Sequence, residues 1–276
     1  MNKSILITFF LLFGFLVNSF AQDKIEIADI VMNNLGDDQM YAHKRDEAKT
    51  PLNGKVRIIT GFTTEYIDAE FKNGYGINKW EYYRKNKLTI SVNLKDGYMD
   101  GEFTEFYPSG DIKEKGRYIK GQKDGTWETL KSDGIIKQTE VFEKGEKIKT
   151  ITYYTDGKVD RERNFKNGKE HGIDKQYTWE GDLKSEKNYV NGKQVGKQTQ
   201  YYSSNQSNFV QISNYNDKGQ LDGEFTETFA DNKAVKTKGQ YKEGRKTGKW
   251  VYGYPHKLYK EEIYEDGKLL ETKKLD

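Results

Sequence analysis

An aromatic or large apolar residue followed three or four positions later by glycine recurs nine times along this chain, at steps of 23 to 26 residues. The starting positions are Phe71, Leu94, Tyr118, Phe142, Phe165, Tyr189, Tyr215, Tyr241 and Tyr264. The glycines are Gly74, Gly97, Gly121, Gly145, Gly168, Gly192, Gly219, Gly244 and Gly267. In six units a second glycine follows four residues later, at Gly101, Gly125, Gly172, Gly196, Gly223 and Gly248. A fixed period of this length is typical of repeat proteins, in which each unit packs on its neighbours.

Each unit has the sequence pattern of a β-hairpin. Asn or Asp often precedes the first glycine, and these residues best tolerate the positive φ that both central positions of a tight hairpin turn require. A second turn signal lies within the unit, as at Ser109-Gly110 and Asp156-Gly157. Residues 111–118 alternate polar and less polar side chains, which predicts a strand. We therefore expect an all-β fold, an elongated single-layer antiparallel β-meander of about nine hairpin repeats over residues 51–276, with a short C-terminal cap from residue 264.

The second glycine of the unit needs its own explanation. Trp127, Phe103, Phe225 and Trp250 all lie two residues after such a glycine. We expect a glycine such as Gly125 to offer bare backbone on which an aromatic ring from a neighbouring strand lies flat.

The segments GEFTEFYPSGDIKEKGRYIKG (101–121) and GEFTETFADNKAVKTKGQYKEG (223–244) resemble the MORN repeat. The resemblance is closest to the variant in bacterial proteins often labelled YwqK-type antitoxins, and it covers about Pro51 to Asp276. It departs from the pattern at Gly76, which follows Gly74 by two residues, and at Lys149, which replaces the second glycine. The units from Tyr189 and Tyr215 also carry insertions. The resemblance implies scaffolding, contact with membranes or lipids, and an antitoxin role.

The N-terminal residues predict export. Lys3 precedes a thirteen-residue apolar run from Ile5 to Val17, followed by Ser19-Phe20-Ala21. This pattern is typical of a removable signal peptide over residues 1–21, so we expect a periplasmic or secreted protein. The chain has no cysteine, so neither a lipid anchor nor a disulfide is expected. Residues 22–50 fall outside the period, and for them we expect one strand at IEIADIV and an exposed charged loop over residues 36–50.

Composition and motifs argue against several function classes. Residues 1–21 hold one Lys and no acid, so the rest of the chain has 45 basic and 43 acidic residues and a net charge of +2. This balance gives no reason to expect a nucleic-acid partner. The three histidines stand alone, and the pair Glu102/Glu105 recurs as Glu224/Glu227, as expected of a repeat framework. We expect no enzyme activity, no cofactor and no metal site.

Two features are candidates for binding. Trp179 lies outside the position two residues after the second glycine, and the stretch from Val235 to Trp250 holds six basic side chains against one Glu. Those six are Lys236, Lys238, Lys242, Arg245, Lys246 and Lys249. We expect a non-catalytic binding or scaffold protein of the cell envelope that engages a protein partner. Binding of a polysaccharide or anionic lipid surface, neutralisation of a toxin, and self-association through open sheet edges remain alternatives.

Overall fold

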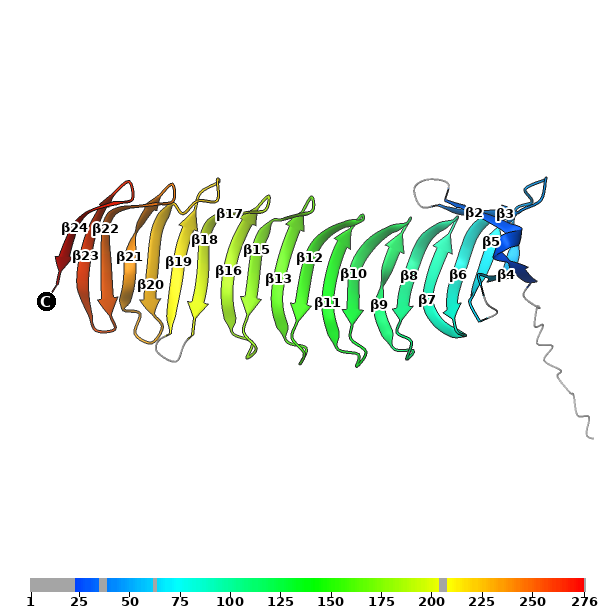
Figure 1. Cartoon of the computed structure of the whole chain (residues 1–276), viewed down its shortest axis with the longest axis horizontal. Helices are drawn as coiled ribbons and strands as arrows, with labels where there is room; N and C mark the ends of the chain where they lie inside the picture. The colour runs from blue at the N-terminus through cyan, green and yellow to red at the C-terminus, as the bar shows by residue number, and fades with distance from the viewer. Residues whose placement is uncertain (1–22, 35–38, 62–63, 204–207, 276) are drawn as a thin grey trace, which may run out of the picture.

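The computed structural model describes residues 23–34, 39–61, 64–203 and 208–275, which form one sheet of 24 strands (Figure 1). The expected signal peptide at residues 1–21 lies outside the described residues. The first elements are β1 (Asp23–Glu26), a 3₁₀ turn η1 (Ile27–Asp29), β2 (Ile30–Asn34) and β3 (Met40–Lys44).

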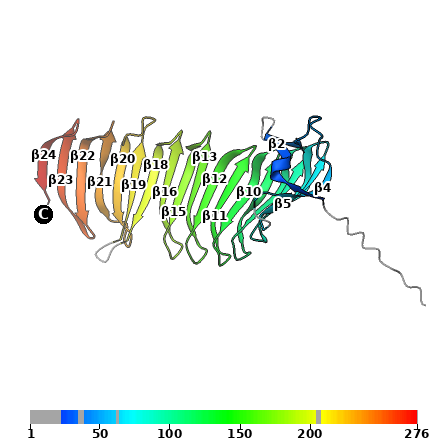
Figure 2. The same cartoon turned by 45° about the vertical axis from the view of Figure 1, so that its right-hand side comes forward.

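The repeats supply the remaining strands. Those of the first half are β4 (Gly54–Ile59), β5 (Tyr66–Lys72), β6 (Tyr75–Arg84), β7 (Lys87–Lys95), β8 (Tyr98–Phe106), β9 (Ile112–Ile119), β10 (Gln122–Leu130), β11 (Ile136–Glu143), β12 (Glu146–Tyr153), β13 (Val159–Lys166) and β14 (Lys169–Glu170). Those of the second half are β15 (Gly172–Tyr177), β16 (Leu183–Val190), β17 (Lys193–Gln194), β18 (Gly196–Tyr202), β19 (Phe209–Tyr215), β20 (Gly223–Phe229), β21 (Val235–Lys242), β22 (Arg245–Tyr254), β23 (Lys257–Glu265) and β24 (Lys268–Lys274). Repeat strands that follow one another pair antiparallel, except that β15 and β18 pair with β13 and β16 rather than with the short β14 and β17. Figure 2 shows the same single row from a second side. The expected single-layer antiparallel meander is confirmed.

The tight turns between units form as their sequence predicts. In the turn at Asn191-Gly192 both φ angles are positive, 51° and 82°. The glycine also links units, because the Gly192 N–H donates to the Glu170 carbonyl at 2.8 Å, as Gly121 does to Met99. Gly219 is an exception: it closes a longer turn in which its N–H donates to Asn216 O at 2.9 Å.

The expected role of the second glycine was wrong. A Cβ on Gly125 would meet nothing within 4 Å, whereas one on Gly116 would lie 2.2 Å from Cδ2 of Trp127. Gly239 stands in the same relation to Trp250. Gly125 instead has a φ of +65°, at a bulge where the register between β9 and β10 shifts. The bulge directs the ring of Trp127 onto β9, so the ring lies on Gly116, one strand away.

The N-terminal segment also differs from expectation. Residues 40–44, expected within an exposed loop, form β3, in which Ala42 is fully buried and His43 is 8% exposed. β2 and β3 pair with each other and lie at the end of the sheet beside β4 to β6 (Figure 1). They cover the largest hydrophobic core of the protein, which contains Ile30, Ala42, Leu52, Val56, Ile58, Ala69, Phe71, Trp80, Val92 and Leu94. Among the residues that the structure describes, the second layer therefore lies at the N-terminal end of the sheet.

The opposite end of the sheet is thin. The expected C-terminal cap contributes β24, which pairs with β23 and is exposed along its whole length. Leu269 and Leu270 are 45% and 55% exposed. β24 therefore ends the sheet as an exposed edge strand.

Candidate binding surface

One face of the sheet carries two matching clusters of aromatic rings. In the first, Trp127 contacts Phe103 and Tyr118 at ring-centroid distances of 5.4 and 4.9 Å, and the Lys123 ammonium lies 3.7 Å from its ring centroid. The second cluster repeats this arrangement with Trp250, Phe225, Tyr241 and Lys246. Trp127 and Trp250 are 2% and 1% exposed. These tryptophans pack the repeats together and are not open to a ligand.

Between the two clusters the same face becomes polar. The positions equivalent to Trp127 hold Asp174 and Gln198, which are 3% and 5% exposed. Asp174 accepts from Nε of Arg161 at 3.0 Å, and Gln198 binds the backbone N–H and carbonyl of Asn188. The repeat itself continues through this region, with aromatic residues at Phe165, Tyr189 and Tyr215. Only the ring at the Trp127 position is replaced, by a buried side chain that forms hydrogen bonds.

The predicted basic stretch does not form one patch. Lys238 pairs with Glu224 at 2.7 Å, Lys249 with Glu261 at 2.5 Å, and Lys236 with Glu227 at 3.5 Å. Lys246 packs over the Trp250 ring at 4.2 Å, and burial lowers its pKa. Lys242 and Arg245 are exposed and flank the tight turn at Glu243-Gly244. Acids on neighbouring strands therefore pair with three of the six basic side chains of the stretch.

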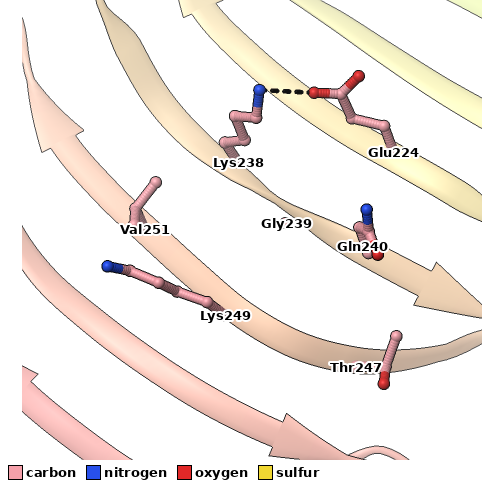
Figure 3. Close-up of a pocket in the computed structure, with 7 residues that line it drawn as sticks. All are labelled: Glu224, Lys238, Gly239, Gln240, Thr247, Lys249 and Val251. Carbon is pink, nitrogen blue, oxygen red and sulfur yellow. Dashed lines mark ion pairs between the residues drawn. The ribbon is translucent and has the colours of Figure 1, made fainter.

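Part of the stretch lines a shallow hollow of about 380 Å³ on the other face (Figure 3). Its lining residues are Glu224, Lys238, Gly239, Gln240, Thr247, Lys249 and Val251. An equivalent hollow of about 460 Å³ surrounds Gly116, and there Lys115 pairs with Glu128 at 2.9 Å. In both hollows ion-paired side chains surround a glycine backbone, which suits weak polar contacts with a large partner.

Trp179 lies at a turn between β15 and β16 and is 47% exposed. Its ring meets the edge of Tyr154 at 5.1 Å, and its carbonyl accepts from the Lys158 ammonium at 3.2 Å. Tyr202 and Tyr254 are 40% and 57% exposed and end β18 and β22. They lie at turns on the same long edge of the sheet as Trp179, opposite the edge that carries the tight turns. The structure does not bring Trp179 together with the basic stretch.

Glu262, opposite Trp250, lies in a buried hydrogen-bonded group that sequence reasoning missed. Burial alone would raise its pKa, but hydrogen bonds from Lys260, Tyr252 and Tyr264 outweigh this and lower the pKa to about 2. The Lys260 ammonium lies 2.9 Å from Oε1, and the Tyr264 hydroxyl donates to Oε2 at 2.8 Å. The sequence does not distinguish Glu262 from its neighbours Glu261 and Glu265, so it gave no signal that Glu262 is the buried one of the three.

The depressed pKa of Glu262 predicts a pH-dependent stability. The stabilisation is present above the unfolded pKa of about 4.5 and is lost as the pH falls towards 2. In a one-layer sheet we expect a contribution of about 1–2 kcal/mol. Glu262→Gln should remove this part of the acid sensitivity in urea unfolding at pH 5 and pH 2.5, whereas the exposed Glu265→Gln should not. Equal acid sensitivity in wild type and Glu262→Gln would contradict the assignment.

Among the described residues there is no group of three or more His, Cys, Asp or Glu side chains placed to hold a metal ion. The described residues also include no helix long and apolar enough to cross a membrane.

No family model and no curated protein matches the chain. Among solved structures, one similar chain is a mutant of TarM from S. aureus, crystallised with fondaparinux, α-GlcNAc-glycerol and UDP. The identity is 15% and the TM-score 0.23, over 44% of this chain and 21% of TarM, so the chain spans about a fifth of that protein's length. A TM-score of this size carries no argument about fold or function.

Proposed function

We propose that this protein is a non-catalytic binding protein of the cell envelope that engages a protein partner along its repeat sheet. The observation that carries the proposal is the single layer. From β9 onward the described residues place no second layer on either face, and the hydrophobic cluster that lies between two layers is at the N-terminal end. The sequence pattern of residues 1–21 supports the envelope location.

A sheet of this kind favours an extended interface over a small-molecule site. Both hollows are open and shallow and have ion-paired walls, whereas a small-molecule pocket encloses most of its ligand. A stable protein complex buries about 1,600 Å². The accessible surface of this protein is 18667 Å², so one row of repeats can supply such an area without any rearrangement.

Chemical cross-linking in the source cells, followed by purification of the tagged protein and mass spectrometry, tests the proposal. We expect one protein to be recovered reproducibly from the envelope fraction, in a fixed ratio to the bait. A tagged protein of similar size carrying the same residues 1–21 is the control for export and capture. Recovery from the cytoplasm, or recovery of the bait without any protein partner, would contradict the proposal.

A polysaccharide is the second candidate partner, because the edge that carries Trp179 exposes aromatic rings, on which sugars stack. Capture without a protein partner, combined with retention on a glycan array that Trp179→Ala abolishes, would favour this alternative. If the captured protein is a toxin, its loss of activity in the complex would assign the immunity-type role.

A further inference from the structure

The protein already holds one extended peptide across its tight turns, namely its own β3. The Ala42 N–H donates to the carbonyl of Gly74 at 2.8 Å, and the Met40 N–H donates to the carbonyl of Gly97 at 2.8 Å. Two consecutive turn glycines thus accept hydrogen bonds from alternate residues of one crossing strand. In Figure 1 this strand lies at the upper edge, where the tight turns of the other repeats follow in a row.

These two turns also need glycine because β3 passes too close to them to leave room for a side chain. A Cβ on Gly74 would lie 2.3 Å from the ring of Tyr41, and one on Gly97 would lie 2.6 Å from the Met40 carbonyl. The Tyr41 ring also meets the Tyr75 ring edge-on at 5.2 Å. The crossing strand is therefore held by backbone hydrogen bonds and by an aromatic ring seated on a turn glycine.

Further along the same row, the turns at Gly168 and Gly192 offer the same groups without an occupant. No donor among the described residues reaches either carbonyl, and a Cβ on either glycine would meet nothing within 4 Å. Beside Gly192 a hollow of about 220 Å³ is lined by Val190, Asn191, Lys193, Val195 and Asp217. Val190 is 41% exposed and makes the mouth of this hollow apolar.

The charge at these two turns selects the kind of peptide. Lys166, Lys169 and Lys193 flank the glycines and are exposed, and within the part of the chain that the structure describes they form no ion pair. These three lysines outnumber the one acid on the wall of the hollow, Asp217, so the charge at the two turns favours a negatively charged ligand.

We propose that the turns around Gly168 and Gly192 bind an extended acidic peptide segment of the protein partner, laid across the turn row as β3 lies across Gly74 and Gly97. The peptide N–H groups donate to the two glycine carbonyls, an aromatic or apolar side chain sits over Gly192 beside Val190, and flanking acids meet the three lysines. The proposal rests on the proposed function and adds the class of segment and its place on the sheet.

A fluorescence-polarisation titration of the full chain tests the proposal, with the labelled peptide EDMYAED as probe. This peptide joins the β3 pattern of methionine, tyrosine and alanine to acidic ends. We expect saturable binding that weakens about tenfold or more in the variant K166E/K169E/K193E, since three charge contacts are reversed. The matched variant K184E/K233E/K257E, which changes lysines near the opposite turns, should bind within about twofold of wild type. The peptide KKMYAKK, whose end charges are reversed, and the peptide EDMAAED, which lacks the ring, should both bind more weakly.

Equal binding to wild type and K166E/K169E/K193E, or no binding of EDMYAED, would overturn the proposal. Anionic vesicles that bind through these lysines while the peptide does not would also overturn it and assign the edge to lipid. The circular-dichroism melt of each variant controls for folding. A partner captured equally well by K166E/K169E/K193E would leave the proposed function intact and reject only this site.

Discussion

Trp127→Ala is expected to lower the free energy of unfolding by about 3–5 kcal/mol, and Gly116→Ala by about 1–3 kcal/mol, with costs that do not add. The tryptophan is 2% exposed, and a Cβ added at Gly116 would lie 2.2 Å from its ring. Once the ring is removed, the same Cβ has space. The double variant should therefore cost no more than Trp127→Ala alone, which a double-mutant cycle measured by urea unfolding and circular dichroism will show.

Gly125→Ala is the matched control, because it changes a glycine two residues from the same ring. A Cβ there has open space, but the φ of +65° should cost about 1–2 kcal/mol. This cost does not depend on the ring and should persist in the Trp127→Ala background. Repeat proteins can unfold in parts, so hydrogen exchange at the amides of β9 and β10 should locate the loss. Additive costs for Gly116→Ala and Trp127→Ala would contradict the ring-on-glycine contact.

Asp174→Ala is expected to cost about 2–3 kcal/mol, because it leaves Arg161 in the centre of the sheet with only its longer ion pair, to Glu170 at 3.9 Å. Breaking a buried pair costs about 3–5 kcal/mol when both ions are buried, and the Arg161 side chain is 36% exposed, which reduces the figure. Asp174→Leu combined with Arg161→Met should recover most of the loss, since it replaces the pair with apolar groups of similar size.

The exposed pair of Lys175 and Glu186, 3.6 Å apart on neighbouring strands, provides the comparison. Glu186→Ala should change stability by less than about 0.5 kcal/mol. Thermal melts monitored by circular dichroism measure all of these variants. If Asp174→Ala and Glu186→Ala cost the same, Asp174 does not hold the central repeats together.

The turns of this fold were predictable from the sequence because dipeptides such as Asn191-Gly192 carry their own conformational preference. The glycine on which the Trp127 ring packs was not predictable. Spacing along the chain places Gly125 near the ring but does not say which neighbouring strand the ring lies on. That choice is made by the bulge in β10, where the register to β9 shifts. Local signals predicted the hairpins, and pairing between strands decided the packing.

Non-local pairing also explains why two charged segments look different in the sequence and in the structure. Residues 40–44 look like an exposed loop because their partners, such as the Gly74 and Gly97 carbonyls, are 32 and 57 residues away. The stretch from Val235 to Trp250 looks basic because the acids that neutralise it, Glu224 and Glu261, lie outside it. The three lysines at the Gly168 and Gly192 turns do not form a basic run in the sequence. The structure shows that they share one edge of the sheet, because both tight turns lie there.

The most direct test of the account places a photo-cross-linking residue in living source cells at one of three exposed positions, Ile173, Val190 or Leu258, which are 46%, 41% and 37% exposed. If the sheet engages a protein partner along its tight-turn edge, Val190 will give one discrete protein adduct and Leu258, near the opposite turns, will give none. The absence of a protein adduct from all three positions would contradict the proposed function. An adduct from Leu258 but not from Val190 would keep a protein partner and move it to the other edge.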